Sequence, residues 1–428
     1  MFNGEQHGRS DDNNKRHVWI FNHYAISPDL AGGTRHYSLA RELVNMGFEV
    51  TIFASNVNHA EKRAVRLQNG GLWAVESING VKFLWLRSFT YSRNNWRRIL
   101  NVLSYFFMAL LKGVYRPGNI HKPDIIIGSS VHLLAVLAGR FLAWYYKVKF
   151  ISEIRDLWPQ TLIDSGTISE TGLVALIMRR FEFFLYNHSD HIITLLPLAS
   201  EYICQRGIPK SRVSWISNGV DLSDYPDFSP KIPGHPKTHF KIFYTGSHGI
   251  YDDLDTIVNC AIILQERNIK NITFVLVGDG IAKKQLLAKA KENNLENIEF
   301  RNPVSKHLIP EVLHEADACI LVNMDIPLYK YGISSNKLFD YLAAGKPVIM
   351  VGNVVENPVE KAHCGVTVRP DNPELLAAAC LDLPSMDVAQ LIQWGANGRR
   401  YVEQYYSYTY LASRLAGIIN SLCTKATH

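Results

Sequence analysis

The sequence lacks several features that would place it in a special class of protein. Its six cysteines are scattered and no two form a CxxC pair, so neither a zinc site nor a disulfide framework is indicated. Unpaired cysteines of this kind are typical of the reduced thiols of a cytosolic protein. Residues 1–16 are polar and lack the apolar core of a secretory signal, so they predict a disordered leader.

Long apolar runs are also missing. The longest, residues 99–115 and 131–146, are interrupted by Lys112 and Arg140, and neither supplies the clean stretch of about 18 apolar residues that a transmembrane helix needs. No GxGxxG pattern is present, which leaves a dinucleotide site unsupported. Lysine and arginine are spread along the chain without a nucleic-acid-binding pattern, so no nucleic-acid partner is expected.

The composition that remains is that of a globular protein. Apolar residues make up 47% and charged residues 20% of 428 residues, a length that suits two domains of about 200 residues each. The formal net charge of +6 is modest. Its sign is compatible with an anionic lipid surface or a phosphorylated substrate.

Apolar runs and helical stripes alternate in the first half of the chain. Residues 34–46 carry a helical stripe that Gly47 ends. Strands are expected at residues 17–24, 48–55, 124–129, 149–156, 191–196 and 212–218. Alternation of this kind predicts a parallel sheet covered by helices on both faces.

The alternation stops at residues 221–239, which contain four prolines and predict a linker. It then restarts, with strands expected at residues 240–246, 272–278, 298–302, 318–323 and 347–352. The sequence therefore predicts an α/β protein with two Rossmann-like, doubly wound domains, residues 17–220 and 240–387, facing across a cleft. Residues 388–428 predict helices that pack back toward the N-terminal domain.

A phosphate site is indicated after the first strand, where Gly32 and Gly33 precede a helix. Two glycines allow the backbone to come close to a ligand, and the helix start offers free N–H groups and a positive dipole end. A simple tight turn is the alternative.

A second anion site is indicated at the helix that begins near residue 335. Ser334 or Ser335 is expected to cap this helix, with Asn336 and Lys337 in its first turn. Free N–H groups together with an ammonium suit a diphosphate. Asp340 lies one turn further on the same side and is expected to accept hydrogen bonds from ribose hydroxyls. A well-capped helix with solvent-facing charges remains the alternative.

Two further segments lie at expected strand ends. Gly278 and Asp279 close a strand and predict a turn near the cleft, although turn chemistry alone explains them equally well. Arg155 and Asp156 end another strand and are followed by Trp-Pro, which favours a binding edge over an ordinary surface salt bridge.

Taken in order, these motifs resemble glycosyltransferase family 4, which has the GT-B fold, from residue 17 to about residue 410. The resemblance rests on residues 32–43, 155–159, 216–221, 278–280 and 335–341. Three of these segments are similar to the WbuB-like branch of bacterial O-antigen and capsule glycosyltransferases.

The resemblance implies a retaining, metal-independent hexosyltransferase without a cofactor. The N-terminal domain would bind the acceptor and the C-terminal domain a nucleotide-diphosphate sugar, such as a UDP-N-acetyl sugar. Gly33 would approach the donor phosphates, and Ser335, Asn336 and Lys337 would hold them. Asp340 would bind the ribose, and the base would lie near Arg301.

The sequence departs from the family at three places. Gly332 stands where the family often has a glutamate that contacts the donor sugar. Ser247 and His248 occupy a stretch where relatives often carry an arginine and a lysine, so Lys337 would carry more of the phosphate charge. Arg155 and Asp156 replace a common histidine. Lys337, Asp156 and Arg155 are therefore the candidate catalytic residues.

The acceptor side of the predicted enzyme contains a basic and aromatic segment at residues 96–116. This composition favours a helix that lies on an anionic membrane, with a core helix under a cationic cap as the alternative. The resemblance implies an acceptor linked to undecaprenyl diphosphate and a peripheral location on the cytoplasmic face of the bacterial inner membrane. Two other functions stay open: a UDP-sugar 2-epimerase, and a non-catalytic nucleotide-sugar-binding partner in a glycan-assembly complex.

Overall fold

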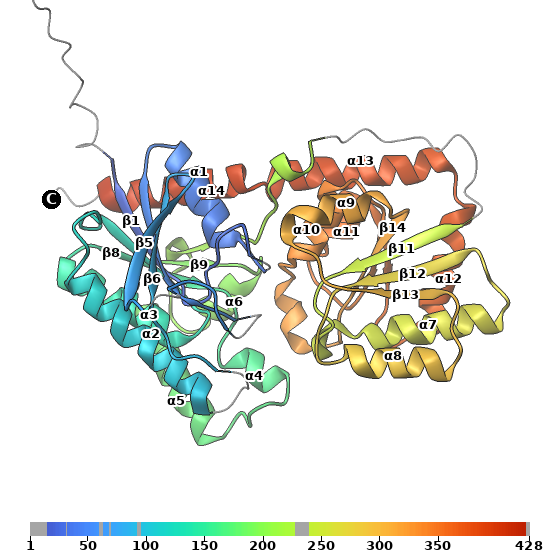
Figure 1. Cartoon of the computed structure of the whole chain (residues 1–428), viewed down its shortest axis with the longest axis horizontal. Helices are drawn as coiled ribbons and strands as arrows, with labels where there is room; N and C mark the ends of the chain where they lie inside the picture. The colour runs from blue at the N-terminus through green and yellow to red at the C-terminus, as the bar shows by residue number, and fades with distance from the viewer. Residues whose placement is uncertain are drawn as a thin grey trace, which may run out of the picture.

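The computed structural model describes residues 15–30, 32–59, 63–67, 70–91, 96–226 and 239–424. These residues form two α/β domains that lie side by side (Figure 1). Most of the predicted leader and most of the predicted linker, residues 1–14 and 227–238, lie outside the described residues.

The N-terminal sheet has eight strands in the order β10-β9-β8-β7-β1-β2-β6-β5. The strands are β1 (His17–Phe21), β2 (Glu49–Ser55), β5 (Trp73–Ile78), β6 (Val81–Leu86), β7 (Ile125–Ser129), β8 (Lys149–Ile154), β9 (His191–Thr194) and β10 (Val213–Trp215). All neighbours are parallel except the edge pair β5–β6, and the two short strands β3 (Val57–Asn58) and β4 (Arg63–Ala64) pair separately. The six strands expected here are confirmed.

Both faces of this sheet are covered, as its apolar strands require. In β1, Val18 and Ile20 face one core, and Trp19 and Phe21 face the other, because successive side chains of a strand alternate. Helices α1 (Arg35–Asn45) and α14 (Tyr408–Thr424) cover the first face, and α2 (Trp96–Val114), α3 (Leu133–Tyr146) and α5 (Leu173–Asn187) the second (Figure 1).

The C-terminal sheet has six parallel strands in the order β13-β12-β11-β14-β15-β16. They are β11 (Phe240–Thr245), β12 (Ile272–Val277), β13 (Ile298–Arg301), β14 (Ala318–Val322), β15 (Val348–Val351) and β16 (Gly365–Val368). Helices α7 (Leu254–Glu266), α8 (Lys283–Glu292) and α12 (Pro373–Ser385) pack on one face. Helices α9 (Ile309–His314), α10 (Asn336–Ala343), α11 (Pro358–Ala362) and α13 (Val388–Tyr405) pack on the other.

The chain returns to the N-terminal domain at its end. Helix α13 lies against α10, and the chain then passes through Ser407 into α14, which packs on α1 (Figure 1). At the crossing, Val220 N–H donates to the Tyr406 carbonyl at 3.0 Å and the Val220 carbonyl accepts from Tyr408 N–H at 3.1 Å. These bonds hold the second crossing beside the end of the N-terminal domain.

No single helix among the described residues is both long and apolar enough to cross a membrane. Helices α12 and α13 reach the length and composition only as a pair, and the pair is bent by 111°.

A buried ion pair holds the first turn of α1. Arg35 donates to Glu153 Oε1 from Nε at 3.0 Å and from Nη2 at 2.8 Å, and it also donates to the Ile216 and Ser217 carbonyls. His36 Nε2 donates to Glu153 Oε2 at 2.5 Å. Burial alone would raise the pKa of Glu153, but His36 and Arg35 hold the pKa of this carboxyl well below its usual range. Helix α1, strand β8 and the segment after β10 are thereby fixed to one another.

The two domains touch through loops that follow their strands. Gly332 has φ of +90°, and a Cβ there would lie 2.4 Å from Pro197 Cγ in the N-terminal domain. Beside this contact, N–H of Leu198, the residue after Pro197, donates to the carbonyl of Tyr331, the residue before Gly332, at 3.1 Å. The glutamate that the family often carries at position 332 therefore has no room in this arrangement.

We predict that Glu153→Ala destabilises the N-terminal domain by about 3–5 kcal/mol, because Arg35 would remain buried without its carboxylate. Urea unfolding followed by tryptophan fluorescence measures the change. Glu299→Ala, which removes an exposed partner of Arg301, serves as the control and is expected to cost at most about 1 kcal/mol. A similar small loss for both variants would contradict the structural role of the buried pair.

We also predict that Gly332→Ala lowers the free energy of unfolding by roughly 1–3 kcal/mol, because the new Cβ meets Pro197 and the positive φ disfavours any side chain. Gly118→Ala, where an added Cβ meets nothing within 4 Å, is the matched control and should stay within about 0.5 kcal/mol of the parent protein. Equal stability of both variants would show that the Gly332–Pro197 contact does not constrain the domains.

Candidate functional site

The predicted cleft lies where the carboxyl ends of the two sheets meet. Ser217 Oγ lies 2.9 Å from Ser334 Oγ, and Asn218 donates to Ser334 from its backbone N–H at 2.9 Å and from its side chain at 2.8 Å. These bonds join the end of the N-terminal domain to the loop before α10. They place the expected anion sites of the two domains next to each other.

Two helix starts converge at this point. A Cβ on Gly33, just before α1, would lie 3.4 Å from Asn336 Nδ2 at the start of α10. Neither Thr34 nor Ser335, the residues at the two N-cap positions, makes a side-chain capping bond. The first N–H groups of both helices therefore lack a capping oxygen, which suits an anion between them.

The expected serine cap on α10 is thus wrong. Ser335 makes no capping bond, and the Ser334 hydroxyl is used at the domain junction, where it meets Ser217 and Asn218. The convergence of the anion sites does not depend on this cap.

Buried polar atoms without partners cluster around the same cleft. Among the described residues, Asn336 Oδ1, Asn218 Oδ1 and both ring nitrogens of His248 are buried and make no hydrogen bond. Buried polar groups are nearly always satisfied, so unpaired ones at a strand edge point to a bound ligand or water. Asn336 was expected to bind the donor, and Asn218 was not singled out from the sequence.

Lys337 is held in the cleft by its neighbours. Its Nζ donates to the Tyr244 hydroxyl at 2.5 Å and forms an ion pair with Asp252, and its methylene groups pack over Gly246. Burial lowers the pKa of the Lys337 ammonium, and the Asp252 carboxylate opposes this shift. The expected phosphate-binding lysine is therefore present but already paired with a carboxylate that the sequence reading had not connected with it.

His248 lies in the loop after β11 and is completely buried. Burial, with a contribution from Lys283, lowers the pKa of His248 to about 4, so the imidazole is neutral at pH 7. Its neighbour Ser247 is exposed, and its carbonyl accepts from the Tyr244 hydroxyl at 2.6 Å. A neutral imidazole in this position can donate or accept one hydrogen bond to a ligand but cannot supply positive charge.

The Gly278–Gly280 turn has a packing role in this fold. A Cβ on Gly278 would lie 1.8 Å from the Gly246 carbonyl oxygen, and His248 N–H donates to the Asp279 carbonyl at 2.9 Å. The turn thus supports the loop that carries Ser247 and His248. The Asp279 carboxylate accepts from Gly280 N–H at 2.8 Å and lies on the surface.

Asp340, the expected ribose ligand, is buried and already bonded. Its Oδ1 accepts from Lys306 Nζ at 2.6 Å and from the Tyr225 hydroxyl at 3.0 Å. Ribose hydroxyls would have to share or replace these donors, so the ribose role stays a prediction.

Arg301, expected near the nucleotide base, is engaged elsewhere. Its guanidinium pairs with Glu299 at 2.8 Å and with Glu315 at 3.0 Å. Its carbonyl accepts from Lys283 Nζ at 2.9 Å. Its role at the base also stays a prediction.

Arg155 and Asp156 follow β8 on the N-terminal side. Arg155 is partly buried, with its backbone N–H bonded to Ser130 Oγ at 2.9 Å, and Asp156 is exposed as a whole residue. No ion pair between the two side chains is found among the described residues, so the surface salt bridge that was the alternative does not form. Burial of the Asp156 carboxyl raises its pKa, and the charge of Arg155 opposes this shift.

Sequence reasoning missed a group of rings at the ends of β1 and β7. His23 is buried and stacks on Tyr105 with ring centroids 4.3 Å apart, and its Nδ1 lies 2.6 Å from His132 Nε2. Tyr24 stacks on His59 at 4.3 Å. The rings come from segments distant in the sequence, including helix α2, and only the polar Asn22–Tyr24 end of an apolar strand could have indicated them.

Comparison with known families covers most of the chain. Residues 32–224 match the model described as Glycosyltransferase Family 4, and residues 239–385 match the model described as Glycosyl transferases group 1. A relative from Pseudomonas aeruginosa described as "Probable glycosyltransferase WbjE" is 21% identical over 355 residues, which are 79% of this chain and 85% of that protein.

Solved structures share the fold at low identity. Sucrose-phosphate synthase from Thermosynechococcus elongatus matches with a TM-score of 0.71 and 16% identity, over 96% of this chain and 100% of that chain. Anabaena HepE in complex with UDP and glucose matches with a TM-score of 0.65 and 14% identity, over 95% and 100%. WaaG, a glycosyltransferase of lipopolysaccharide biosynthesis, matches with a TM-score of 0.61 and 13% identity, over 94% and 99%.

The motif order, the two parallel sheets that meet at their carboxyl ends and the two matching family models agree with one another. The chain belongs to glycosyltransferase family 4 and has the GT-B fold.

Proposed function

We propose that the chain is a retaining glycosyltransferase that moves a sugar from a UDP-sugar, such as a UDP-N-acetyl sugar, to a lipid-linked saccharide during bacterial surface polysaccharide synthesis. The observation that carries this proposal is the convergence of two uncapped helix starts beside the partly buried Lys337. A donor diphosphate fits such a site by charge and by hydrogen bonding. The HepE structures, whose titles name UDP and UDP-glucose, support UDP as the nucleotide.

The leaving group would be stabilised by groups that are fixed before the donor arrives. Lys337 and the N–H groups at the starts of α1 and α10 would face the β-phosphate as it gains charge. The Asp252 carboxylate pairs with the Lys337 ammonium in this structure. The incoming phosphate would take the place of this carboxylate, so the positive charge of Lys337 would still be balanced by an anion. No metal or cofactor is required in this scheme.

Retention of configuration would follow from attack on the face that the leaving group departs from. The β-phosphate itself can accept the proton of the attacking hydroxyl, so catalysis is mostly positioning and charge stabilisation. The carboxylate of Asp156 would orient the acceptor hydroxyl or the sugar, with Arg155 beside it.

The acceptor would reach the cleft from an anionic membrane, on whose cytoplasmic face the protein would lie peripherally. Helices α2, α3 and α5 lie side by side over one face of the N-terminal sheet (Figure 1). Their outer surface exposes fourteen large apolar side chains at or beside these helices: Trp96, Ile99, Phe107, Leu111, Tyr115, Phe141, Trp144, Tyr145, Leu173, Val174, Leu176, Ile177, Phe183 and Phe184. We call this set the apolar face. An apolar area of this extent on a soluble domain marks an interaction site.

The charges around the apolar face favour a membrane over a second protein copy. The three helices carry six cations: Arg97, Arg98, Lys112, Arg140, Arg179 and Arg180. Their one acidic residue, Glu182, is buried and bonded to Tyr186. Cations mixed with exposed aromatic and aliphatic side chains are typical of surfaces that lie on anionic lipid. The inner side of α2 packs in the domain core through Tyr105 and Ala109, so one side of this helix belongs to the core and the other to the apolar face.

The proposed function predicts nucleotide release from one member of a donor panel in the presence of lipid-linked N-acetylglucosamine. Lys337→Ala is expected to lower kcat/KM by roughly 100–1,000-fold, because the charge on the departing diphosphate loses its ammonium. Lys284→Ala, which changes an exposed lysine of the same domain, is the control and should leave turnover unchanged.

Two outcomes would overturn this assignment. Near-normal turnover of Lys337→Ala would remove the lysine from the mechanism. Formation of an epimer from the donor alone, without acceptor, would replace transfer by epimerisation. Retention itself is read from the anomeric configuration of the product by NMR.

The apolar face predicts binding to vesicles that contain phosphatidylglycerol and weaker binding to phosphatidylcholine alone. The double variant Phe107→Ser, Ile177→Ser should reduce co-sedimentation by about tenfold or more, because two exposed apolar side chains no longer enter the lipid. Ile281→Ser, at a still more exposed residue of the C-terminal domain, is the control and should bind as the parent protein does. Equal loss in both variants, or no vesicle binding by the parent protein, would refute a membrane role for this face.

A further inference from the structure

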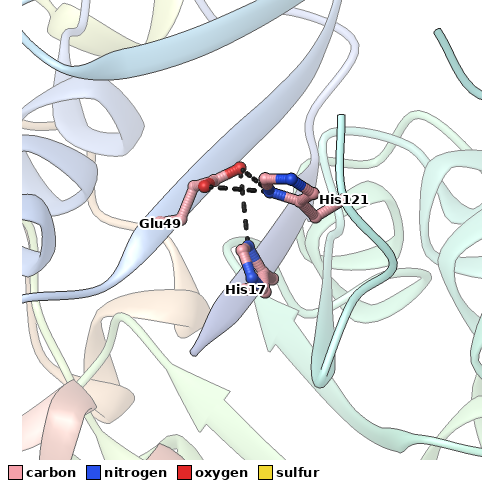
Figure 2. A group of neighbouring side chains, drawn as sticks. All are labelled: His17, Glu49 and His121. Carbon is pink, nitrogen blue, oxygen red and sulfur yellow. Dashed lines mark hydrogen bonds and ion pairs between the residues drawn. The ribbon is translucent and has the colours of Figure 1, made fainter. Parts of the chain in front are cut away.

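Three segments of the N-terminal domain bring two imidazoles and a carboxylate together at the amino edge of its sheet. His17 begins β1, Glu49 begins the neighbouring strand β2, and His121 lies in the loop that leads into β7 (Figure 2). His17 and Glu49 are direct partners in the parallel register. Figure 2 shows the three side chains turned toward one another.

The separations within this group match those of metal ligands. His17 Nδ1 lies 3.4 Å from Glu49 Oε1, and His121 Nδ1 lies 3.1 Å from each Glu49 oxygen. Zinc bonds of about 2.0–2.1 Å at tetrahedral angles place neighbouring ligand atoms roughly 3.3–3.4 Å apart. One ion could therefore be reached by all three side chains with small rotations.

The state of the ligand atoms also favours an ion. His17 Nδ1 is buried and makes no hydrogen bond, although a carboxylate oxygen lies beside it. The His121 side chain is about half exposed, with a relative accessibility of 53%, so an ion could enter there and keep a water in its remaining position. Two imidazoles and one carboxylate form a ligand set that Zn²⁺ commonly uses in proteins.

A lysine competes for the same carboxylate. Lys82 Nζ donates to Glu49 Oε1 at 2.8 Å and to the Asn119 carbonyl at 2.9 Å. Its positive charge opposes a divalent ion, while Glu49 Oε2 has only His121 as a partner among the described residues. Lys82 is thus expected to weaken the site without blocking it.

We propose that His17, Glu49 and His121 form a Zn²⁺ site that joins β1, β2 and the segment before β7. The site lies at the amino ends of the strands, whereas the catalytic cleft lies at their carboxyl ends, so the ion takes no part in sugar transfer. Its role is to stabilise the N-terminal domain, because the ion binds the folded arrangement of three separate segments.

The test is titration of the whole metal-free protein with Zn²⁺ alone by calorimetry, together with the Co²⁺ visible spectrum as a readout of coordination geometry. We expect one Zn²⁺ per chain, an intense tetrahedral Co²⁺ spectrum and a rise in Tm with added Zn²⁺. His121→Ala, at a half-exposed loop residue, should weaken Zn²⁺ binding by about tenfold or more and abolish the Co²⁺ signal. His188→Ala, at another exposed histidine of the same domain, should change neither.

The variant Lys82→Gln is expected to change the affinity for Zn²⁺ in the opposite direction to His121→Ala. Removal of the competing ammonium should tighten Zn²⁺ binding by about fivefold or more, which non-specific surface binding would not show. Absence of one-to-one Zn²⁺ binding in the parent protein, or unchanged affinity in both His121→Ala and Lys82→Gln, would overturn the proposal. Glycosyl transfer in the presence of a chelator should continue, so a failed metal site and a failed enzyme assignment are read from separate experiments.

Discussion

The guanidinium of Arg35 holds the parts of the cleft in register. It binds the Glu153 carboxylate on β8 and the carbonyls of Ile216 and Ser217 after β10. Because Arg35 is the first residue of α1, this contact fixes the helix start behind Gly33. Because Ser217 contacts Ser334, the same contact fixes the loop before α10. Both proposed anion-binding helix starts therefore depend on one buried cation that is bonded inside the N-terminal domain.

On the proposed donor side of the cleft, the charged side chains are already paired with one another. Lys337 is paired with Asp252, and Asp340 with Lys306. Compensation of this kind keeps a buried ammonium charged although burial lowers its pKa. An uncompensated lysine in the same place would be more easily deprotonated and less useful to a departing diphosphate. Under the proposed function, donor binding would exchange the partner of Lys337, whose charge is present beforehand.

The architecture could be predicted from the sequence because parallel strands that are buried on both faces appear as short apolar runs. All eleven expected strands are present, and each is an apolar run between turn residues. Strands β5 and β16 were not predicted, since they lie at sheet edges, where exposed and buried residues mix. The short strands β3 and β4 were also not predicted, nor was β6, although β6 is a mostly buried apolar run inside the sheet. Edge strands carry less periodic hydrophobicity than central ones.

The site was predictable only where the chemistry is local. The Gly-Gly turn and Lys337 were found because helix starts and adjacent residues occur together in the sequence. The partners of Lys337 and Asp340, which are Asp252, Lys306 and Tyr225, lie 34 to 115 positions away and have no sequence signal. The expected serine cap failed for the same reason, because Ser334 had a competing partner in the other domain. A polar side chain such as that of Ser334 can bond to its own helix or to a distant segment, and only the tertiary structure decides between these partners.

The return of the chain through α14 also limits how the two domains can move. The polypeptide passes between them twice, once just before Val220, which packs in the core of the C-terminal domain, and once at Ser407, and a β-bridge joins Val220 to Ser407. Because the two crossings are bonded to each other, both covalent connections between the domains meet at one place, and a rotation of one domain against the other that keeps these bonds has its pivot there. Cutting the chain between the sheets would not yield two complete domains either, because the N-terminal core takes its last helix from the far end of the sequence.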